Sequence, residues 1–406
     1  MKFFFNSIAL LLVLFSAKAQ ENNAFTVGHE ASFQSKILGE QRKIWIHVPN
    51  SDGGNTITNK AHYPVIYLLD GSDNFNSVVS ITEHMSSEGL CPPMIVVGIL
   101  HPDRMLDLTL GLDEDFPGFI GRGEKFMSYI EKELMPYIES TYPTTSYKTF
   151  IGHSVGGSTV MNTLIHQPNL FNAYVCLDGA LWWDHQKIVK EAKPALANNN
   201  YKGKTLFMAL ANRMERGVDT LAVQKDTTRS TLLIRSNLKL IKDVQKNTKN
   251  ELRFKHKYYE DDDHGSLRLI GEYDALRFIF DYYKLKIYNS EIDNPNLDLE
   301  SLIVAHYKNV SEEMGYVVKP DESQINNFAY ATMNKRQFNG AENLFKLNIA
   351  NYPESANCYD SMGDLYLAKG DRIKAVENFK KALTLKDIPE TKEKLEQLLK
   401  TKEINN

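Results

Sequence analysis

The stretch that decides the fold is "YKTFIGHSVGGSTVMN", residues 147–162. An apolar run stops at a Gly-His-Ser-Val-Gly core, residues 152–156, and a helix-like pattern of small and apolar residues follows at once. Glycines flank the serine because a Cβ at those positions of so tight a turn would collide with neighbouring backbone. The stretch therefore predicts a nucleophile elbow that exposes Ser154, with a purely structural glycine corner as the alternative.

Composition sets the size and the broad class of the protein. The chain has 406 residues, of which 42% are hydrophobic and 24% charged, enough for a full core and for two or three domains. Its net charge of -4 gives no electrostatic reason to expect nucleic acid or an anionic membrane surface as a partner. We therefore expect a globular protein, and the charge of its substrate stays open.

The N-terminus reads as a secretory signal peptide, residues 1–19. Lys2 precedes an apolar stretch that is too short to span a bilayer, and Ala17-Lys18-Ala19 is typical of a cleavage site. Cleavage after Ala19 would leave an exported protein, periplasmic or secreted, and no later segment is long and apolar enough to be a membrane span.

The region from residue 24 to 286 alternates short β-rich runs with helical patterns, which predicts an α/β fold with a mostly parallel sheet. Residues 31–38 and 42–49 look like an opening antiparallel pair. The expected central strands lie within residues 63–71, 93–100, 147–153, 172–179, 204–212 and 253–260. This is the catalytic domain that an elbow at Ser154 requires.

The C-terminal third has a different character. Residues 287–322 carry scattered apolar residues and are expected to form a linker with some local helix. In residues 323–402, Ala329, Ala341 and Phe345 recur 34 residues later as Gly363, Ala375 and Phe379. This period resembles the tetratricopeptide repeat, in which small residues let two helices approach closely, and a generic helical hairpin is the alternative.

A serine hydroxyl needs a base that removes its proton. His264, in "KYYEDDDHGSLRLI", follows the last expected strand and precedes a helix, so that a loop can bring its ring to Ser154. His153 is expected to face away from the serine by strand alternation, and His256 lies inside a strand. We therefore predict that His264 is the base.

The triad acid of this architecture follows a strand between the serine and the histidine. The loop after residues 204–212 offers Glu215 as the leading candidate and Asp219 as the second. Asp178, one strand earlier, is a third. The sequence leaves these alternatives open.

The negative charge that develops on the substrate oxygen needs two backbone N–H donors. Val155, directly after the serine, offers one at the start of a helix. The loop after "YLLDG" offers the second, at Gly71 or Ser72. None of these steps needs a cofactor or a metal, and the three cysteines do not have the spacing of a zinc site.

Several motifs together resemble the esterase branch of the α/β-hydrolases, which includes siderophore esterases, S-formylglutathione hydrolase, feruloyl esterases and mycolyltransferases. The motifs are "PVIYLLDG" (64–71), "VVGILHPDRMLDLT" (96–109), "YIEKELMPYIESTYP" (129–143), "GHSVGG" (152–157), "LWWD" (181–184) and "DDDHGS" (261–266). The resemblance implies that Ser154 and His264 are catalytic and that the Ser72 amide lines the oxyanion hole.

Two departures from the family pattern affect the site. Members similar around "LWW" commonly have Ser-Pro-Ser before it, where this chain has Asp178-Gly179-Ala180. The Gly-x-x-Glu after the seventh strand is replaced by "ANRME", residues 211–215. The first alters one wall of the pocket, and the second bears on the choice of acid.

The leading hypothesis is an exported serine hydrolase that cleaves carboxylic esters, including glycan-linked esters, through an acyl-enzyme. One alternative is an acyltransferase that passes the acyl group to a sugar or lipid alcohol. The other is a non-catalytic interaction protein that binds a peptide, or a second copy of itself, through the helical repeats.

Overall fold

A computed structural model describes residues 26–49, 61–110 and 121–403; the predicted signal peptide lies outside them. The described chain forms an eight-stranded sheet in the order β1-β2-β4-β3-β5-β6-β7-β8. β1 pairs antiparallel with β2, and β2 with β4, whereas all other neighbours are parallel. The strands are β1 (His29–Gln34), β2 (Gln41–His47), β3 (Tyr63–Leu68), β4 (Ile95–Ile99), β5 (Thr144–His153), β6 (Ala173–Leu177), β7 (Thr205–Ala211) and β8 (Arg253–Tyr259). This confirms the α/β-hydrolase fold, the opening antiparallel pair and the six predicted central strands.

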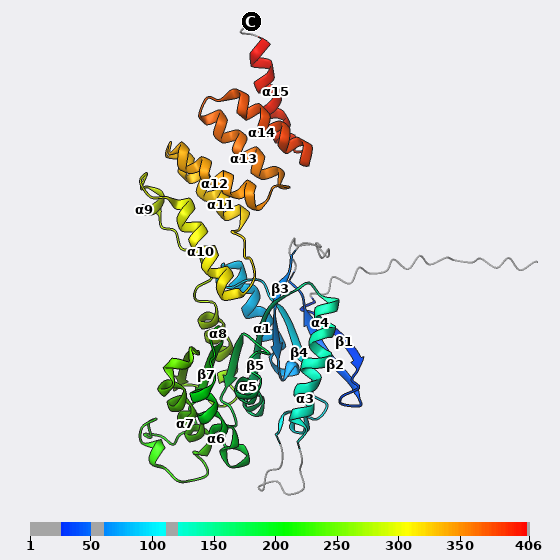
Figure 1. Ribbon diagram of the computed structural model, residues 1–406, viewed down its shortest axis with the longest axis vertical. Coiled ribbons are helices and arrows are strands. Elements are labelled where there is room, and N and C mark those ends of the chain that lie inside the picture. The colour runs from blue at the N-terminus through cyan, green and yellow to red at the C-terminus, as the bar shows by residue number, and fades with distance from the viewer. Residues whose placement is uncertain (1–25, 50–60, 111–120, 404–406) are drawn as a thin grey trace, which may run out of the picture.

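Helices cover both faces of the sheet (Figure 1). Side chains alternate between the two faces along each strand, so Val65 and Tyr67 belong to one hydrophobic core, and Ile66 and Leu68 belong to the other. The first core is covered by α3 (Gly123–Tyr129), a π-helical turn (Ile130–Leu134), α4 (Met135–Thr141), α5 (Val155–His166), α6 (Trp183–Asn198) and α7 (Leu232–Lys246). The second is covered by α1 (Gly71–Ser87), α8 (Leu267–Ile279) and part of α10 (Leu299–Met314).

In residues 289–403 the regular elements are all helices, and they extend away from the sheet (Figure 1). After the short α9 (Asn289–Ile292) and α10 come α11 (Glu322–Asn334), α12 (Phe338–Asn351), α13 (Ala356–Ala368), α14 (Arg372–Leu385) and α15 (Pro389–Glu403). Small residues allow close packing here: a Cβ on Gly363 would lie 2.4 Å from the ring of Phe379.

The segment predicted as a linker contains a helix that belongs to both parts of the molecule. Leu299 and Ile303, in the first half of α10, pack in the core of the C-terminal helices. Val310 and Met314, in its second half, pack in the α1–α8 core of the sheet. α10 therefore joins the two cores through one continuous element.

Candidate active site

Ser154 occupies the turn between β5 and α5. Its backbone is in an unusual conformation, with φ 59° and ψ -117°, and its N–H donates to the carbonyl of Leu177 on β6. The Ser154 carbonyl accepts from the N–H groups of Ser158 and Ala180. A non-glycine residue in this region is strained and persists only where its surroundings hold it, which is the condition met at a nucleophile elbow.

The first glycine of the motif allows this turn to form. A Cβ on Gly152 would lie 2.4 Å from the carbonyl oxygen of Gly156, far inside van der Waals contact. Gly156 itself packs near Leu69 and the carboxylate of Asp70. The chain therefore reverses from strand to helix at Ser154 in the way that the motif predicts.

A histidine–carboxylate pair lies beside this turn. His264 Nδ1 is 2.6 Å from Asp178 Oδ2. Asp178 is fully buried after β6, where its backbone has φ 42° and its other carboxylate oxygen accepts from the N–H of Ala211. A carboxylate on Nδ1 fixes the tautomer in which Nε2 can accept a proton.

The two other acid candidates lie elsewhere. Glu215 is exposed in the loop after β7, and the carboxylate of Asp219 is exposed and accepts from the N–H groups of Leu221 and Ala222. The structure thus pairs His264 with Asp178, the third candidate, instead of Glu215. The physical reason is the left-handed turn at Asp178, which directs its carboxylate to the His264 loop.

Internal hydrogen bonds hold the loop that carries His264. The carboxylate of Asp263 accepts from the N–H groups of Gly265 and Ser266. Asn212, in the "ANRME" departure, donates its backbone N–H to the carbonyl of Asp262 and its side-chain N–H to that of Glu260. The residues that replace the family's Gly-x-x-Glu therefore anchor the histidine loop.

His153 lies against His264 although sequence alternation excludes it as the base. Its Nε2 is 2.7 Å from the His264 carbonyl oxygen, to which it donates, and the two ring centroids are 4.4 Å apart. Burial, and then the neighbouring His264, lower the pKa of His153 to about 4. His153 is therefore neutral near pH 7 and acts as a hydrogen-bond donor to the loop. Sequence reasoning missed this contact.

The two amides expected to hold the oxyanion both lie at helix starts. Val155 is the first residue of α5, and Ser72 is the second of α1. The first N–H groups of a helix have no acceptor inside the helix, so they can bind a developing negative charge. Gly71 lets α1 begin close to β4, since a Cβ there would lie 2.6 Å from the Gly98 carbonyl carbon.

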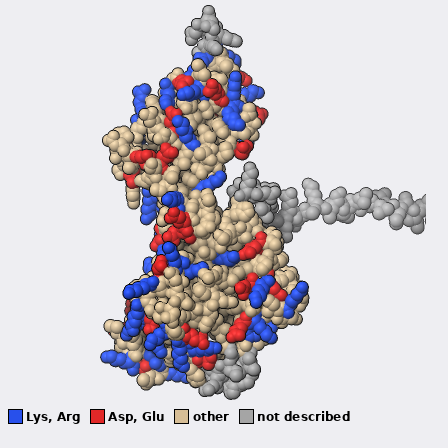
Figure 2. Space-filling model, viewed as in Figure 1, with Lys and Arg blue, Asp and Glu red and all other residues tan. Residues whose placement is uncertain are grey.

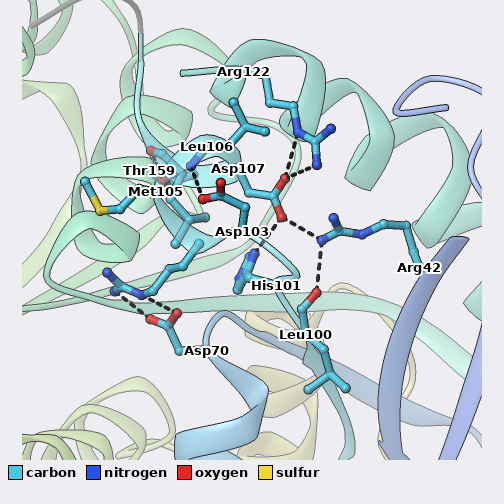
Figure 3. Close-up of polar contacts among 12 residues, drawn as sticks. Arg42, Asp70, Leu100, His101, Asp103, Met105, Leu106, Asp107, Arg122 and Thr159 are labelled. Carbon is cyan, nitrogen blue, oxygen red and sulfur yellow. Dashed lines mark hydrogen bonds and ion pairs between the residues drawn. The ribbon is translucent and has the colours of Figure 1, made fainter. Parts of the chain in front are cut away.

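The segment between β4 and α3 carries a buried ionic cluster that sequence reasoning quoted only as a family motif. Asp107 is fully buried and accepts from Arg42 Nη2 at 2.8 Å and from Arg122 Nη2 at 2.8 Å. His101 Nδ1 lies 3.0 Å from the same carboxylate, which Figure 3 shows between the two guanidinium groups. Burial raises the pKa of Asp107, but hydrogen bonds from His101 and the two arginines outweigh it, and the net shift is downward. Four charged or polar groups thus fix this segment beside the site.

Arg104, at the start of α2 (Arg104–Leu108), connects that segment to the site. Its Nε and Nη2 donate to Asp70 Oδ1 at 2.6 Å and Oδ2 at 2.8 Å, and Nη2 also donates to the His153 carbonyl at 3.0 Å. Asp70 immediately precedes α1 and has a left-handed backbone with φ 56°. The only sequence signal for Arg104 was its place in the family-like motif 96–109.

Within the described ranges, no group of three or more His, Cys, Asp or Glu side chains could hold a metal ion. Cys91, Cys176 and Cys358 are buried free thiols. In the same ranges, no helix has the length and apolar character to cross a membrane.

Comparison with protein families gives a match over residues 35–264, more than half of the chain, to the esterase family described as "Putative esterase". The chain belongs to this family. It is a family of carboxylic ester hydrolases with the α/β-hydrolase fold, and the match includes both Ser154 and His264.

Relatives include siderophore esterases. The chain is 29% identical over 195 residues to ferri-bacillibactin esterase BesA of Bacillus subtilis, covering 42% of this chain and 65% of BesA. It is 26% identical over 153 residues to the siderophore triacetylfusarinine C esterase of Aspergillus fumigatus, covering 34% of this chain and 50% of that protein. The chain thus spans about two thirds of one esterase and half of the other.

Solved structures extend the similarity beyond the sheet. An IroE-like serine hydrolase from Shewanella oneidensis has 27% identity and a TM-score of 0.63, covering 79% of this chain and 98% of that one. An uncharacterised protein from Capnocytophaga ochracea has 20% identity and a TM-score of 0.65, covering 91% of this chain and 99% of that one. The second shows the fold alone.

Proposed function

We propose that the protein is a serine esterase in which Ser154, His264 and Asp178 form the catalytic triad. The observation that carries this proposal is the 2.6 Å contact of His264 with buried Asp178, beside a serine in a strained strand-to-helix turn. His264 Nε2 removes the Ser154 proton during attack on the ester carbonyl, and Asp178 stabilises the imidazolium that forms. The amides of Ser72 and Val155 bind the oxyanion.

His264 then delivers that proton to the departing alcohol, which leaves Ser154 acylated. Water, activated by His264, attacks the acyl-enzyme, releases the acid and regenerates the serine. Every proton is thus transferred through one imidazole.

The substrate class follows from the siderophore esterases among the relatives. We propose that the site accepts esters such as siderophores, and a panel of trilactone siderophores, acetylated sugars and p-nitrophenyl esters tests this. The ratio of kcat/KM values across the panel is the measurement that matters. Equal turnover of all members would contradict siderophore specificity while leaving esterase activity intact.

The acid assignment has its own test. Asp178→Asn keeps the shape of the side chain but removes its charge, so kcat should fall by about 10²- to 10⁴-fold. Glu215→Gln, in the exposed loop, is the matched control and should retain kcat. The reverse pattern would contradict Asp178 as the acid, and full activity of Ser154→Ala would contradict the whole mechanism.

Export is proposed from the N-terminal sequence alone. Residues 1–19 have a charged start, an apolar stretch and a small-residue cleavage site. N-terminal sequencing of protein from cell fractions should give Gln20 as the first residue.

The C-terminal helices are proposed to be tetratricopeptide repeats. Ala329, Ala341 and Ala375 are buried, and Gly363 lies against Phe379. A peptide bound to these helices would not occupy the site at Ser154, so titration with that peptide should leave the esterase kcat unchanged.

A further inference from the structure

We infer that Arg104 is a positioning residue that sets the distance between the two oxyanion amides, and so acts on the transition state without touching the substrate. The inference rests on the proposed function, because it assigns the oxyanion hole to Ser72 and Val155. It gives a role to the conspicuous motif 96–109, which the triad does not use.

The oxyanion hole is built from two chain segments that are far apart in sequence. The Ser72 amide belongs to the turn after β3, and the Val155 amide to the turn after β5. Donors stabilise an oxyanion only when both lie within hydrogen-bond distance of one point. Something must therefore hold the two turns in a fixed relation.

The Arg104 guanidinium bonds to both turns. Two of its N–H groups donate hydrogen bonds to the carboxylate of Asp70, two residues before Ser72. A third contact reaches the carbonyl of His153, two residues before Val155. The planar guanidinium binds the carboxylate through two hydrogen bonds, which fix the orientation of the carboxylate as well as its distance from Arg104. A lysine ammonium cannot make this bidentate contact.

The residue that Arg104 binds, Asp70, has a strained backbone. Asp70 has φ 56°, a left-handed conformation that costs a non-glycine residue free energy. Its carbonyl also accepts from the N–H groups of Asp73 and Asn74 and so begins α1. Releasing the Asp70 carboxylate would therefore let the start of α1, including Ser72, relax.

Hydrogen bonds hold the segment that carries Arg104 in place. Asp103 accepts from the N–H of Leu106 and begins α2, while the Leu108 carbonyl accepts from Thr159 on α5. Asp107, held by Arg42 and Arg122, anchors the same turn (Figure 3). The guanidinium is thus presented from a segment that hydrogen bonds fix to α5 and to the Asp107 cluster.

The test compares Arg104→Met, Arg104→Lys and Asp70→Asn by steady-state hydrolysis of p-nitrophenyl butyrate. Because negative charge on the substrate oxygen is absent from the bound ester and develops only in the transition states and tetrahedral intermediates, kcat should fall by about 10- to 100-fold in Arg104→Met while KM changes by less than about 2-fold. Arg104→Lys keeps the positive charge but loses the bidentate contact, so its kcat should lie between those of Arg104→Met and the wild type. The double variant Arg104→Met/Asp70→Asn should be no worse than Arg104→Met, since Arg104→Met already removes the Arg104–Asp70 contact that Asp70→Asn weakens.

Phenylboronic acid, a mimic of the tetrahedral intermediate, gives a second readout. Its inhibition constant should rise by the same factor as kcat/KM falls. A purely structural defect would lower the melting temperature without this parallel loss.

Arg253→Met is the matched control. Arg253 on β8 is 30% exposed, close to the 34% of Arg104, and it likewise bonds one carboxylate, that of Asp281, and backbone carbonyls. It lies at the opposite end of the sheet, so its loss should cost stability but not kcat.

Two outcomes would overturn the inference. Unchanged kcat in Arg104→Met would remove the positioning role, and a raised KM with unchanged kcat would make Arg104 a substrate-binding residue. Loss of activity in Ser154→Ala would show in either case that the proposed esterase mechanism still stands.

Discussion

At the scale of single residues, the site depends on backbone conformations that few side chains accept. Ser154, Asp178 and Asp70 all have positive φ, and each carries a group that the mechanism or its support uses. The motif around Ser154 predicts one of these turns because its glycines mark the close approach. The sequence offers Asp178 only as the third acid candidate, because the direction of its carboxylate depends on a backbone φ of 42° that no sequence pattern reveals.

His153 gives a prediction at this scale. His153→Phe keeps an aromatic ring but removes the donor to the His264 carbonyl, so the catalytic loop should loosen and kcat should fall by about 10-fold, a net loss typical of one hydrogen bond. His153→Gln keeps a donor and should recover most of the activity.

The measurement is the pH dependence of kcat/KM. The pKa of His153 is about 4, so its own titration should not contribute to the profile above about pH 5. The acidic limb of the profile should therefore stay in place in His153→Gln. A shift of that limb would show that His153 takes part in proton transfer.

At the scale of elements, strands were predictable and contacts between helices were not. The β-rich runs at residues 63–71 and 147–153 indicate buried strands, and their alternation with helical patterns along the chain predicts the parallel sheet. α1 and α8 share the apolar core on their face of the sheet, and within that contact Ser77 on α1 donates to the carboxyl group of Glu272 on α8 at 2.8 Å. No sequence pattern signals a buried glutamate that approaches a serine 195 residues away.

Glu272 makes stability depend on pH. Burial raises its pKa to about 8, only partly opposed by the Ser77 hydroxyl and Arg268. The folded state keeps the proton that the unfolded chain releases near its ordinary pKa, so the free energy of unfolding should fall as pH rises from about 5 to 8.

Glu272→Gln removes this titration while keeping an acceptor for Ser77. Its unfolding free energy should vary less than that of the wild type over this pH range, by about 1.4 kcal/mol for each unit of pKa difference removed. Urea unfolding at pH 5, 6, 7 and 8 measures it. Parallel curves for the two proteins would contradict the assignment.

At the scale of the whole molecule, the 34-residue spacing predicted helical pairs, but nothing in residues 287–322 indicated how they attach. That attachment is α10, whose second half belongs to the core of the sheet. Apolar residues in a helix show that it is buried, but not which partner buries it.

Two substitutions should separate the roles of the two cores. Met314→Ala leaves a cavity in the sheet's core and should destabilise the catalytic part by about 2–5 kcal/mol, although Met314 follows that part in sequence. Gly363→Val forces a side chain against Phe379 and should unfold only the distal helices, α11–α15.

Calorimetry combined with residual esterase activity distinguishes them. Met314→Ala should lower the temperature at which activity is lost, whereas Gly363→Val should add an earlier transition with activity retained. Loss of activity at that earlier transition would contradict independent unfolding of the distal helices.

The shared helix also has a mechanical consequence. A 16-residue helix is a rod about 24 Å long, and α10 is embedded at both ends. α10 therefore joins α11–α15 to the sheet through a packed helix and not through a flexible linker. Because α10 ends beside Ser146 near the amino end of β5, and Ser154 follows the carboxyl end of that strand, these helices are attached at the end of the sheet opposite the candidate active site.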